Sequence, residues 1–156
     1  MDELPLTLET LEIKAKNFTN RSLDKLPESL KSLHMESDYF NDPINKLPPK
    51  LELLTLKILL FNQAIDDLPK TIKSLTIEVR DFNQPIDHLP ENLQFLTIIS
   101  QHFDRMSYYL PINLEYLSIK SKSFQQSLDG LPDGLRYLEI NNAVEFNNPI
   151  DQLPNK

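Results

Sequence analysis

The dipeptide Leu-Pro returns along the whole chain with a period of 21 residues, widened to 22 at the first and last intervals. A fixed period of this length indicates stacked structural units of one kind. Eight of the 12 prolines stand in this dipeptide, so the proline excess reflects a repeat and not a flexible linker. The leucines of the eight dipeptides are Leu4, Leu26, Leu47, Leu68, Leu89, Leu110, Leu131 and Leu153.

Each unit continues with the pattern Pro-x-x-Leu-x-x-Leu-x-Ile, as at Pro90, Leu93, Leu96 and Ile98. Alternating apolar and polar residues predict a short strand with one buried face. A period near 21 residues is enough for one coil of a solenoid, so we expect seven units over residues 1–156, each with one parallel strand. The prolines and the corner Asn and Asp residues predict turns, extended segments and short 3₁₀ turns elsewhere, with little α-helix.

A phenylalanine occupies the same place in every unit, shortly after the predicted strand. We interpret these rings as a spine that stacks coil on coil in the core. The seven residues are Phe18, Phe40, Phe61, Phe82, Phe103, Phe124 and Phe146.

The segment from Phe82 to Ile98 reads Phe-Asn-Gln-Pro-Ile-Asp-x-Leu-Pro-x-x-Leu-x-x-Leu-x-Ile, and its first part recurs at Phe40 and Phe146. This pattern resembles the FNIP repeat, a variety of leucine-rich repeat, over essentially the whole chain. The resemblance implies a curved, right-handed leucine-rich-repeat solenoid with its sheet on the concave face. The family is abundant in social amoebae and in giant viruses that infect amoebae, where such arrays often follow an F-box that links to ubiquitin ligases. The chain has no room for an F-box, so that role would require one on another chain.

In a leucine-rich solenoid, each outward-facing strand position forms a column across the coils. The column just before the buried Leu ends with three consecutive aromatic residues, Phe95, Tyr116 and Tyr137. Together with Ile99 they predict an amphipathic patch of the kind enriched at protein interfaces. Aromatic rungs also stabilise a sheet by cross-strand contacts, so a purely structural role stays open.

Two other columns alternate in charge, which favours cross-strand ion pairs over repulsion. We interpret them as self-neutralising structural ladders. They begin Glu9, Lys31, Glu52, Lys73 and Lys14, Glu36, Lys57, Glu78.

The corner of the fifth unit departs from the pattern, because Asp104–Tyr109 replaces it. An altered loop on a regular scaffold can carry function, which makes Met106, Tyr108 and Tyr109 a second candidate site. Sequence drift at a tolerant corner is the alternative interpretation.

Catalysis and cofactor binding find little support in the sequence. The three histidines fall at unrelated positions of three units, and there is no cysteine, so we expect neither an enzyme nor a metal or cofactor site. A net charge of -7 and a pI near 4.9 disfavour nucleic acid. No long apolar stretch or secretory start is present, so we expect no membrane span and a cytoplasmic location, in the host cell if the protein is viral.

The two ends of the array show no polar cap, although solenoids normally need one. We therefore expect either an excised or truncated array or ends that a partner covers, and a homodimer formed through the end coils is one such arrangement. For function, the sequence predicts a non-catalytic module that binds a protein or peptide on its concave face. The alternative is a substrate-recognition component of a ubiquitin ligase.

Overall fold

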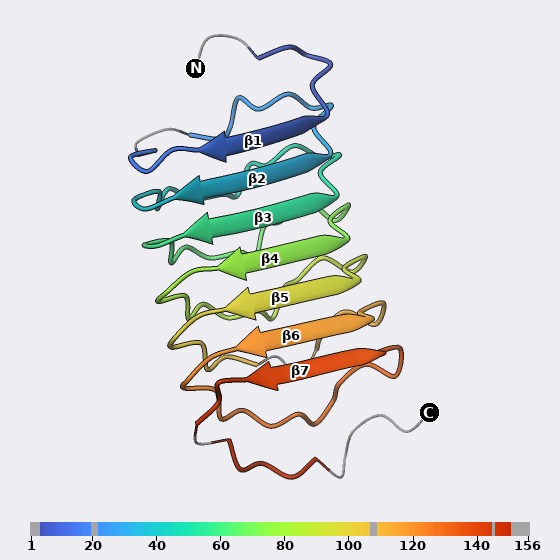
Figure 1. The fold of residues 1–156 in the computed structure, drawn as a ribbon. Coiled ribbons are helices and arrows are strands. Elements are labelled where there is room, and N and C mark those ends of the chain that lie inside the picture. Colours follow the sequence, from blue (N-terminus) through green and yellow to red (C-terminus); the bar gives the residue numbers. More distant parts are fainter. Residues whose placement is uncertain (1–3, 20–21, 107–108, 145, 151–156) are drawn as a thin grey trace.

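The computed structural model describes residues 4–19, 22–106, 109–144 and 146–150, and it consists of parallel strands joined by turns and extended segments (Figure 1). Its single seven-stranded sheet follows the order of the sequence. The strands are β1 (Thr10–Lys14), β2 (Ser32–Ser37), β3 (Leu53–Ile58), β4 (Ser74–Glu78), β5 (Phe95–Ile99), β6 (Tyr116–Lys120) and β7 (Tyr137–Asn141).

Equivalent residues of successive units pair with one another throughout the sheet, as in Leu75 with Leu96. The first interval keeps this register despite its additional residue, since Leu11 pairs with Leu33. The insertion therefore lies outside the strands. Because every unit places the same apolar positions inward, a slip by one residue would turn buried leucines to solvent.

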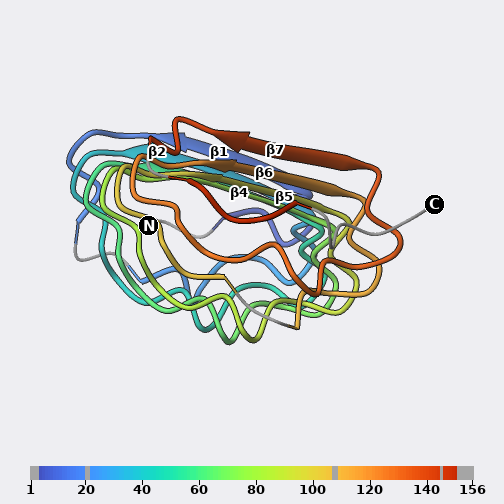
Figure 2. The ribbon, with the colours of Figure 1, turned by 90° about the horizontal axis from the view of Figure 1, so that it is seen from below.

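The coils wind in a right-handed sense, with the sheet on one side and the return segments on the other (Figures 1 and 2). In Figure 2 the end strands β1 and β7 rise above β4 and β5, so the outward face of the sheet is concave. The spacing of the core rings agrees with this curvature. Phe40, Phe61 and Phe82 follow one another at 6.3 and 6.5 Å, wider than the roughly 4.8 Å between neighbouring strands.

The phenylalanine spine predicted from the sequence is the centre of the core. Five of its rings are fully buried, and successive rings from Phe40 to Phe146 stack within 18° of parallel. At the N-terminal side Phe18 is tilted by 39° against Phe40. Leucine and isoleucine side chains from the strands and corners fill the space around the rings.

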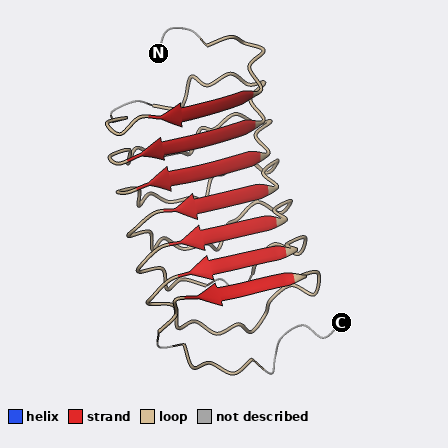
Figure 3. Ribbon diagram, in the orientation of Figure 1, coloured by secondary structure: helices blue, strands red, loops and turns tan. Residues whose placement is uncertain are grey.

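The turn that leads into each strand begins at the recurrent proline. The carbonyl of Pro90 accepts a hydrogen bond from the backbone N–H of Leu93 at 3.0 Å, and the six equivalent turns repeat it at 3.0 or 3.1 Å. Proline suits this place because its carbonyl is used while no N–H is required. Figure 3 shows strands and loops alone, and the described residues contain no helix that is long and apolar enough to cross a membrane.

Side-chain hydrogen bonds tie the corners of successive coils together. In a first ladder, the residue directly after each of several buried phenylalanines has a side-chain oxygen that accepts a hydrogen bond from the backbone N–H of the equivalent residue in the next coil. Asn62 donates to Asn41 at 3.0 Å, Asn83 to Asn62 at 3.2 Å and Asp104 to Asn83 at 3.0 Å. A second ladder uses buried hydroxyls: Ser100 donates to the carbonyl oxygens of Arg80 and Phe82 at 3.0 and 2.9 Å.

Candidate functional site

The three aromatic residues singled out in the sequence lie side by side on the concave face. Strand register places Phe95 against Tyr116 and Tyr116 against Tyr137. Ring centroids are 6.3 Å apart in the first pair and 4.5 Å in the second, where the planes differ by 1°. We call these three residues the aromatic patch. Phe95 and Tyr137 are 46% and 48% exposed, and Tyr116 between them is partly buried.

The rings stack along the direction from strand to strand. The faces of Tyr116 and Tyr137 therefore cover one another, while the ring of Phe95 is tilted by 39° against Tyr116. This arrangement is amphipathic, because apolar edges adjoin phenol groups that donate and accept hydrogen bonds.

A polar cluster adjoins the stacked tyrosines on β6 and β7. The hydroxyl of Ser118 donates to a carboxylate oxygen of Glu139 at 2.6 Å, and the amide of Asn141 donates to the other oxygen at 3.3 Å. The ammonium of Lys120 stands 3.4 Å from the same carboxylate. Ser118 is only 1% exposed, although its strand position faces outward.

These contacts shift two pKa values in opposite directions. The Ser118 hydroxyl, followed by the Asn141 amide, stabilises the carboxylate and lowers the pKa of Glu139. The charge of Glu139 in turn raises the pKa of Tyr137, with smaller contributions from desolvation and Tyr116. Near neutral pH the phenol of Tyr137 is therefore neutral and lies beside the negatively charged carboxylate of Glu139.

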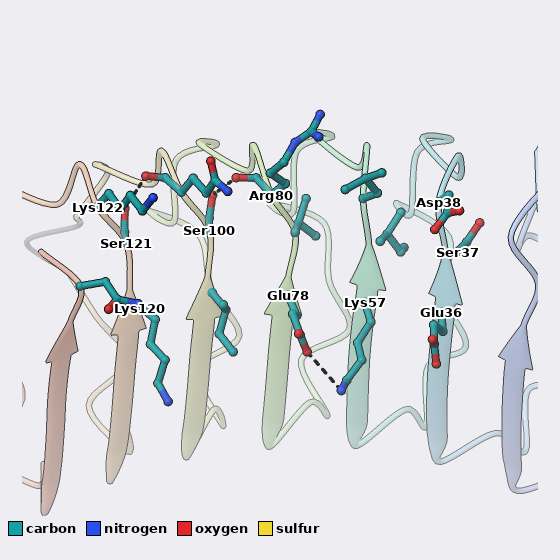
Figure 4. Close-up of a pocket in the computed structure, with 16 residues that line it drawn as sticks. Glu36, Ser37, Asp38, Lys57, Glu78, Arg80, Ser100, Lys120, Ser121 and Lys122 are labelled. Carbon is teal, nitrogen blue, oxygen red and sulfur yellow. Dashed lines mark hydrogen bonds and ion pairs between the residues drawn. The ribbon is translucent and has the colours of Figure 1, made fainter.

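Ile99 belongs to a different part of the same face. It lies at the opposite end of β5 from Phe95, separated from it by three residues along the strand. There it lines a groove of about 640 Å³ that runs across the carboxyl ends of β2 to β6 (Figure 4). The sequence placed Ile99 next to the aromatic residues, whereas the strand holds it about 13 Å away.

The charge columns form ion pairs as the sequence predicts, with one exception. Lys31 pairs with Glu9 and Lys73 with Glu52, both at 2.8 Å, and each lysine reaches back to the preceding coil. The pair Lys57–Glu78 stands at 3.1 Å and Arg136–Glu115 at 3.5 Å. Lys14 differs, because it pairs at 2.8 Å with Glu12 of its own strand. Exposed pairs of this kind set register more than they add stability.

The altered corner of the fifth unit lies away from the aromatic patch. Tyr109 is 84% exposed and lines a groove beside the Leu-Pro corners together with Ile112. Met106 is partly buried against the core, and Tyr108 lies outside the described residues. The departure is smaller than the sequence suggests, because Asp104 continues the corner ladder: its carboxylate accepts the backbone N–H of Gln125 at 2.8 Å.

The histidines stand apart from one another on the surface. His88 lies 3.6 Å from Asp66 and His102 lies 3.6 Å from Asp81, in different coils. Within the part of the chain that the structure describes, no group of three or more His, Asp or Glu side chains is arranged to hold a metal ion. That the protein is not an enzyme and holds no cofactor stays a prediction from the sequence.

Sequence reasoning missed the two hydrogen-bond ladders of the corners. The signal for the first is a polar residue that recurs directly after the phenylalanine, read in the sequence only as part of a polar corner. It comprises Asn41, Asn62, Asn83, Asp104 and Gln125. Their hydrogen bonds join the corners of successive coils from Asn41 to Gln125.

Comparisons with known proteins agree with this geometry. Residues 61–104 match the family model described as FNIP Repeat. No characterised protein gives a sequence match. Among solved structures, the chain is similar to CroV588, described as a novel circular LRR protein, from a giant virus. That similarity has a TM-score of 0.62 and 29% identity, and it covers 97% of this chain and 26% of the other.

This chain therefore spans about a quarter of the length of the circular protein. The shared fold confirms a leucine-rich-repeat solenoid, and the family match confirms the FNIP repeat recognised in the sequence. The protein is thus a leucine-rich-repeat solenoid, and its residues 61–104 match the FNIP Repeat model.

Proposed function

We propose that the protein is a non-catalytic interaction module and that its aromatic patch, Phe95, Tyr116 and Tyr137, contacts a protein or peptide partner. The fold is consistent with this class of function, because stacked repeats create extended concave surfaces that are used for binding. The observation that carries the proposal is the exposure of the two outer residues of the aromatic patch, Phe95 at 46% and Tyr137 at 48%, on the concave face.

The energetics of the patch favour a binding role over a purely structural one. Phe95 and Tyr137 each leave about half of their surface in water, where burial by a partner would stabilise a complex by roughly 25 cal/mol per Å². Beside the rings, Lys120 and Glu139 supply charges of both signs. Aromatic residues surrounded by polar groups are the usual composition of an interface hot spot.

The experiment compares Tyr116→Ser/Tyr137→Ser with the wild type for binding to partners captured from an amoebal lysate. We expect the double variant to lose about 30-fold or more in affinity, as hot-spot truncations of about 2 kcal/mol do. Tyr39→Ser is the matched control, because Tyr39 is 52% exposed and lies after β2, outside the aromatic patch. Unchanged affinity in a folded double variant would refute the role of the patch.

A ubiquitin-ligase role is the alternative function, and the resemblance to FNIP arrays is its sole support. The same capture experiment separates the two proposals. If the protein is a ubiquitin-ligase adaptor, ligase subunits should be recovered with it reproducibly, and their recovery should not depend on the aromatic patch. Capture of the patch-dependent partner without ligase subunits favours the simple binding module.

A second copy of the chain is a further candidate partner. The outer edge of β7 pairs with no strand among the described residues, and Leu138, Ile140 and Phe146 are only partly buried beside a groove of about 540 Å³. Pairing of this edge with β1 of another copy would bury these residues. Light scattering at high concentration tests it, and a mass equal to one chain at every concentration would refute it.

A further inference from the structure

The groove that holds Ile99 has two rows of side chains at the carboxyl ends of the strands (Figure 4). Each coil contributes one residue to each row, so the side chains of a row follow one another from β2 to β6. The first row is Glu36, Lys57, Glu78, Ile99 and Lys120, and the second is Asp38, Leu59, Arg80, Gln101 and Lys122.

Both rows begin with an acid and end with a lysine. Glu36 and Asp38 stand at the β2 end, and neither has an ion pair within the described part of the chain. The nearest lysine of the preceding strand, Lys14, is held 2.8 Å from Glu12. The opposite end carries Lys120 and Lys122. Lys120 has one long contact of 3.4 Å to Glu139, and the structure describes no ion pair for Lys122.

The middle of the groove is neutral. Lys57 and Glu78 neutralise one another at 3.1 Å (Figure 4), and Arg80 pairs with Asp81 at 3.0 Å. On the coils that flank β4, Leu59 is 40% exposed and Ile99 is partly exposed. The groove thus has a negative end, a neutral middle with an exposed aliphatic side chain on either side of β4, and a positive end.

We propose that this groove binds an extended peptide segment that carries basic residues at one end, acidic residues at the other and an aliphatic residue between them. Charge complementarity selects this occupant: a basic group meets Glu36 and Asp38, while an acidic group meets Lys120 and Lys122. The aliphatic residue lies over β4, between Leu59 and Ile99, and shields part of their exposed surface from water.

The spacing of the strands sets the length of the segment. From β2 to β6 there are four strand intervals, or about 19 Å at roughly 4.8 Å each. An extended chain rises about 3.3 Å per residue, so about six residues separate the basic from the acidic end. A segment of about seven residues therefore spans the groove.

This inference deepens the proposed function, because both place a partner on the concave face, but apart from Lys120, which adjoins both surfaces, the two rest on different residues. The aromatic patch lies at the amino ends of β5 to β7, and the groove lies at the carboxyl ends of β2 to β6. Peptide binding that depends on the groove lysines and not on the tyrosines supports this inference alone. Partner binding that depends on the tyrosines supports the proposed function alone.

The test measures fluorescence anisotropy with three labelled heptapeptides on the full chain. The mixed peptide is Lys-Lys-Thr-Leu-Thr-Glu-Glu, and the comparison peptides carry lysine at both ends or glutamate at both ends. We expect the mixed peptide to bind best. Attraction to the net charge of -7 would instead rank the all-lysine peptide first, so the ranking separates groove recognition from bulk electrostatics.

Variants then reverse the preference. Lys120→Glu/Lys122→Glu makes both ends of the groove acidic, so the all-lysine peptide should overtake the mixed one by about fivefold or more at low salt. Lys122→Glu alone should weaken the mixed peptide by about threefold without disturbing the contact between Lys120 and Glu139. Lys70→Glu changes the net charge by the same amount outside the groove and should leave the ranking unchanged.

Circular dichroism confirms that each variant is folded, and Tyr116→Ser/Tyr137→Ser should keep the wild-type ranking. The proposal is overturned if the wild type binds none of the peptides, ranks them by net charge, or keeps its preference in the double lysine variant.

Discussion

Removing the central ring of the phenylalanine spine should destabilise the whole solenoid, whereas removing its last ring should affect one end. Phe82 is fully buried, with Phe61 at 6.5 Å on one side and Phe103 at 6.0 Å on the other. Phe82→Ala leaves a cavity between two rings that belong to different coils. Buried Phe→Ala changes cost about 3–5 kcal/mol, and the loss of two ring contacts places this one in the upper half of that range.

Phe146 supplies the contrast. Among the aromatic rings of the described residues it contacts one, Phe124, at 6.0 Å, and it is partly exposed, so Phe146→Ala should cost about 1–2 kcal/mol. Stability in a solenoid is the sum of coil and nearest-neighbour contributions. The central change therefore weakens both halves of the array, while the terminal change weakens only the coil of β7.

Urea unfolding followed by far-ultraviolet circular dichroism measures both costs, and amide hydrogen exchange locates them. Phe82→Ala should speed exchange in β4 and β5, and Phe146→Ala should speed exchange in β7 only. Phe82→Leu, which keeps most of the apolar volume, should cost less than Phe82→Ala. Equal costs for the central and terminal Ala variants would refute the nearest-neighbour reasoning.

Two further outcomes test the hydrogen bonds. Asn83→Ala removes the acceptor of the Asp104 N–H and should lower the free energy of unfolding by about 1–2 kcal/mol, while Asn83→Asp, which keeps an acceptor, should cost less. Ser118→Ala should raise the pKa of Glu139 toward its ordinary value of 4.5 in an NMR titration. Because that pKa is lowered in the folded protein, the ionised carboxylate contributes to the free energy of unfolding above pH 4.5, and this contribution is lost as the pH falls through the folded-state pKa. The difference in the free energy of unfolding between the wild type and Ser118→Ala should therefore shrink on acidification, and a difference that grows would contradict this reasoning.

The period of the sequence predicted the fold to the level of strand register. A repeat of 21 residues leaves one coil per unit, and the alternation around Leu96 and Ile98 decides which side chains are buried. Both follow from chain geometry and burial, which act within one unit and its neighbours. The seven strands, the parallel pairing and the phenylalanine spine were therefore predictable from one sequence.

Contacts that depend on side-chain direction were harder to predict. The columns place Phe95, Tyr116 and Tyr137 on neighbouring strands, as the structure has them. Grouping Ile99 with them overlooks that four residues of extended strand separate it from Phe95 by about 13 Å. Lys14 forms its ion pair with Glu12 and not with Glu36, because a flexible lysine side chain can reach several carboxylates. The buried hydroxyl of Ser100 was missed, since serine at a corner is equally suited to solvent.

The alternating charge columns have a consequence for how such an array can change length. Deletion of the coil that contains Lys31 would place Glu9 next to Glu52 in one column. Between the same two coils, it would place Lys14 next to Lys57 in the other column. Losing two consecutive coils would restore opposite signs in both columns. Backbone geometry tolerates any whole number of units, but the charges of this part of the array repeat every second coil. Gene duplication and deletion here should therefore be accepted more readily in pairs of repeats, and engineered arrays should be lengthened in the same steps.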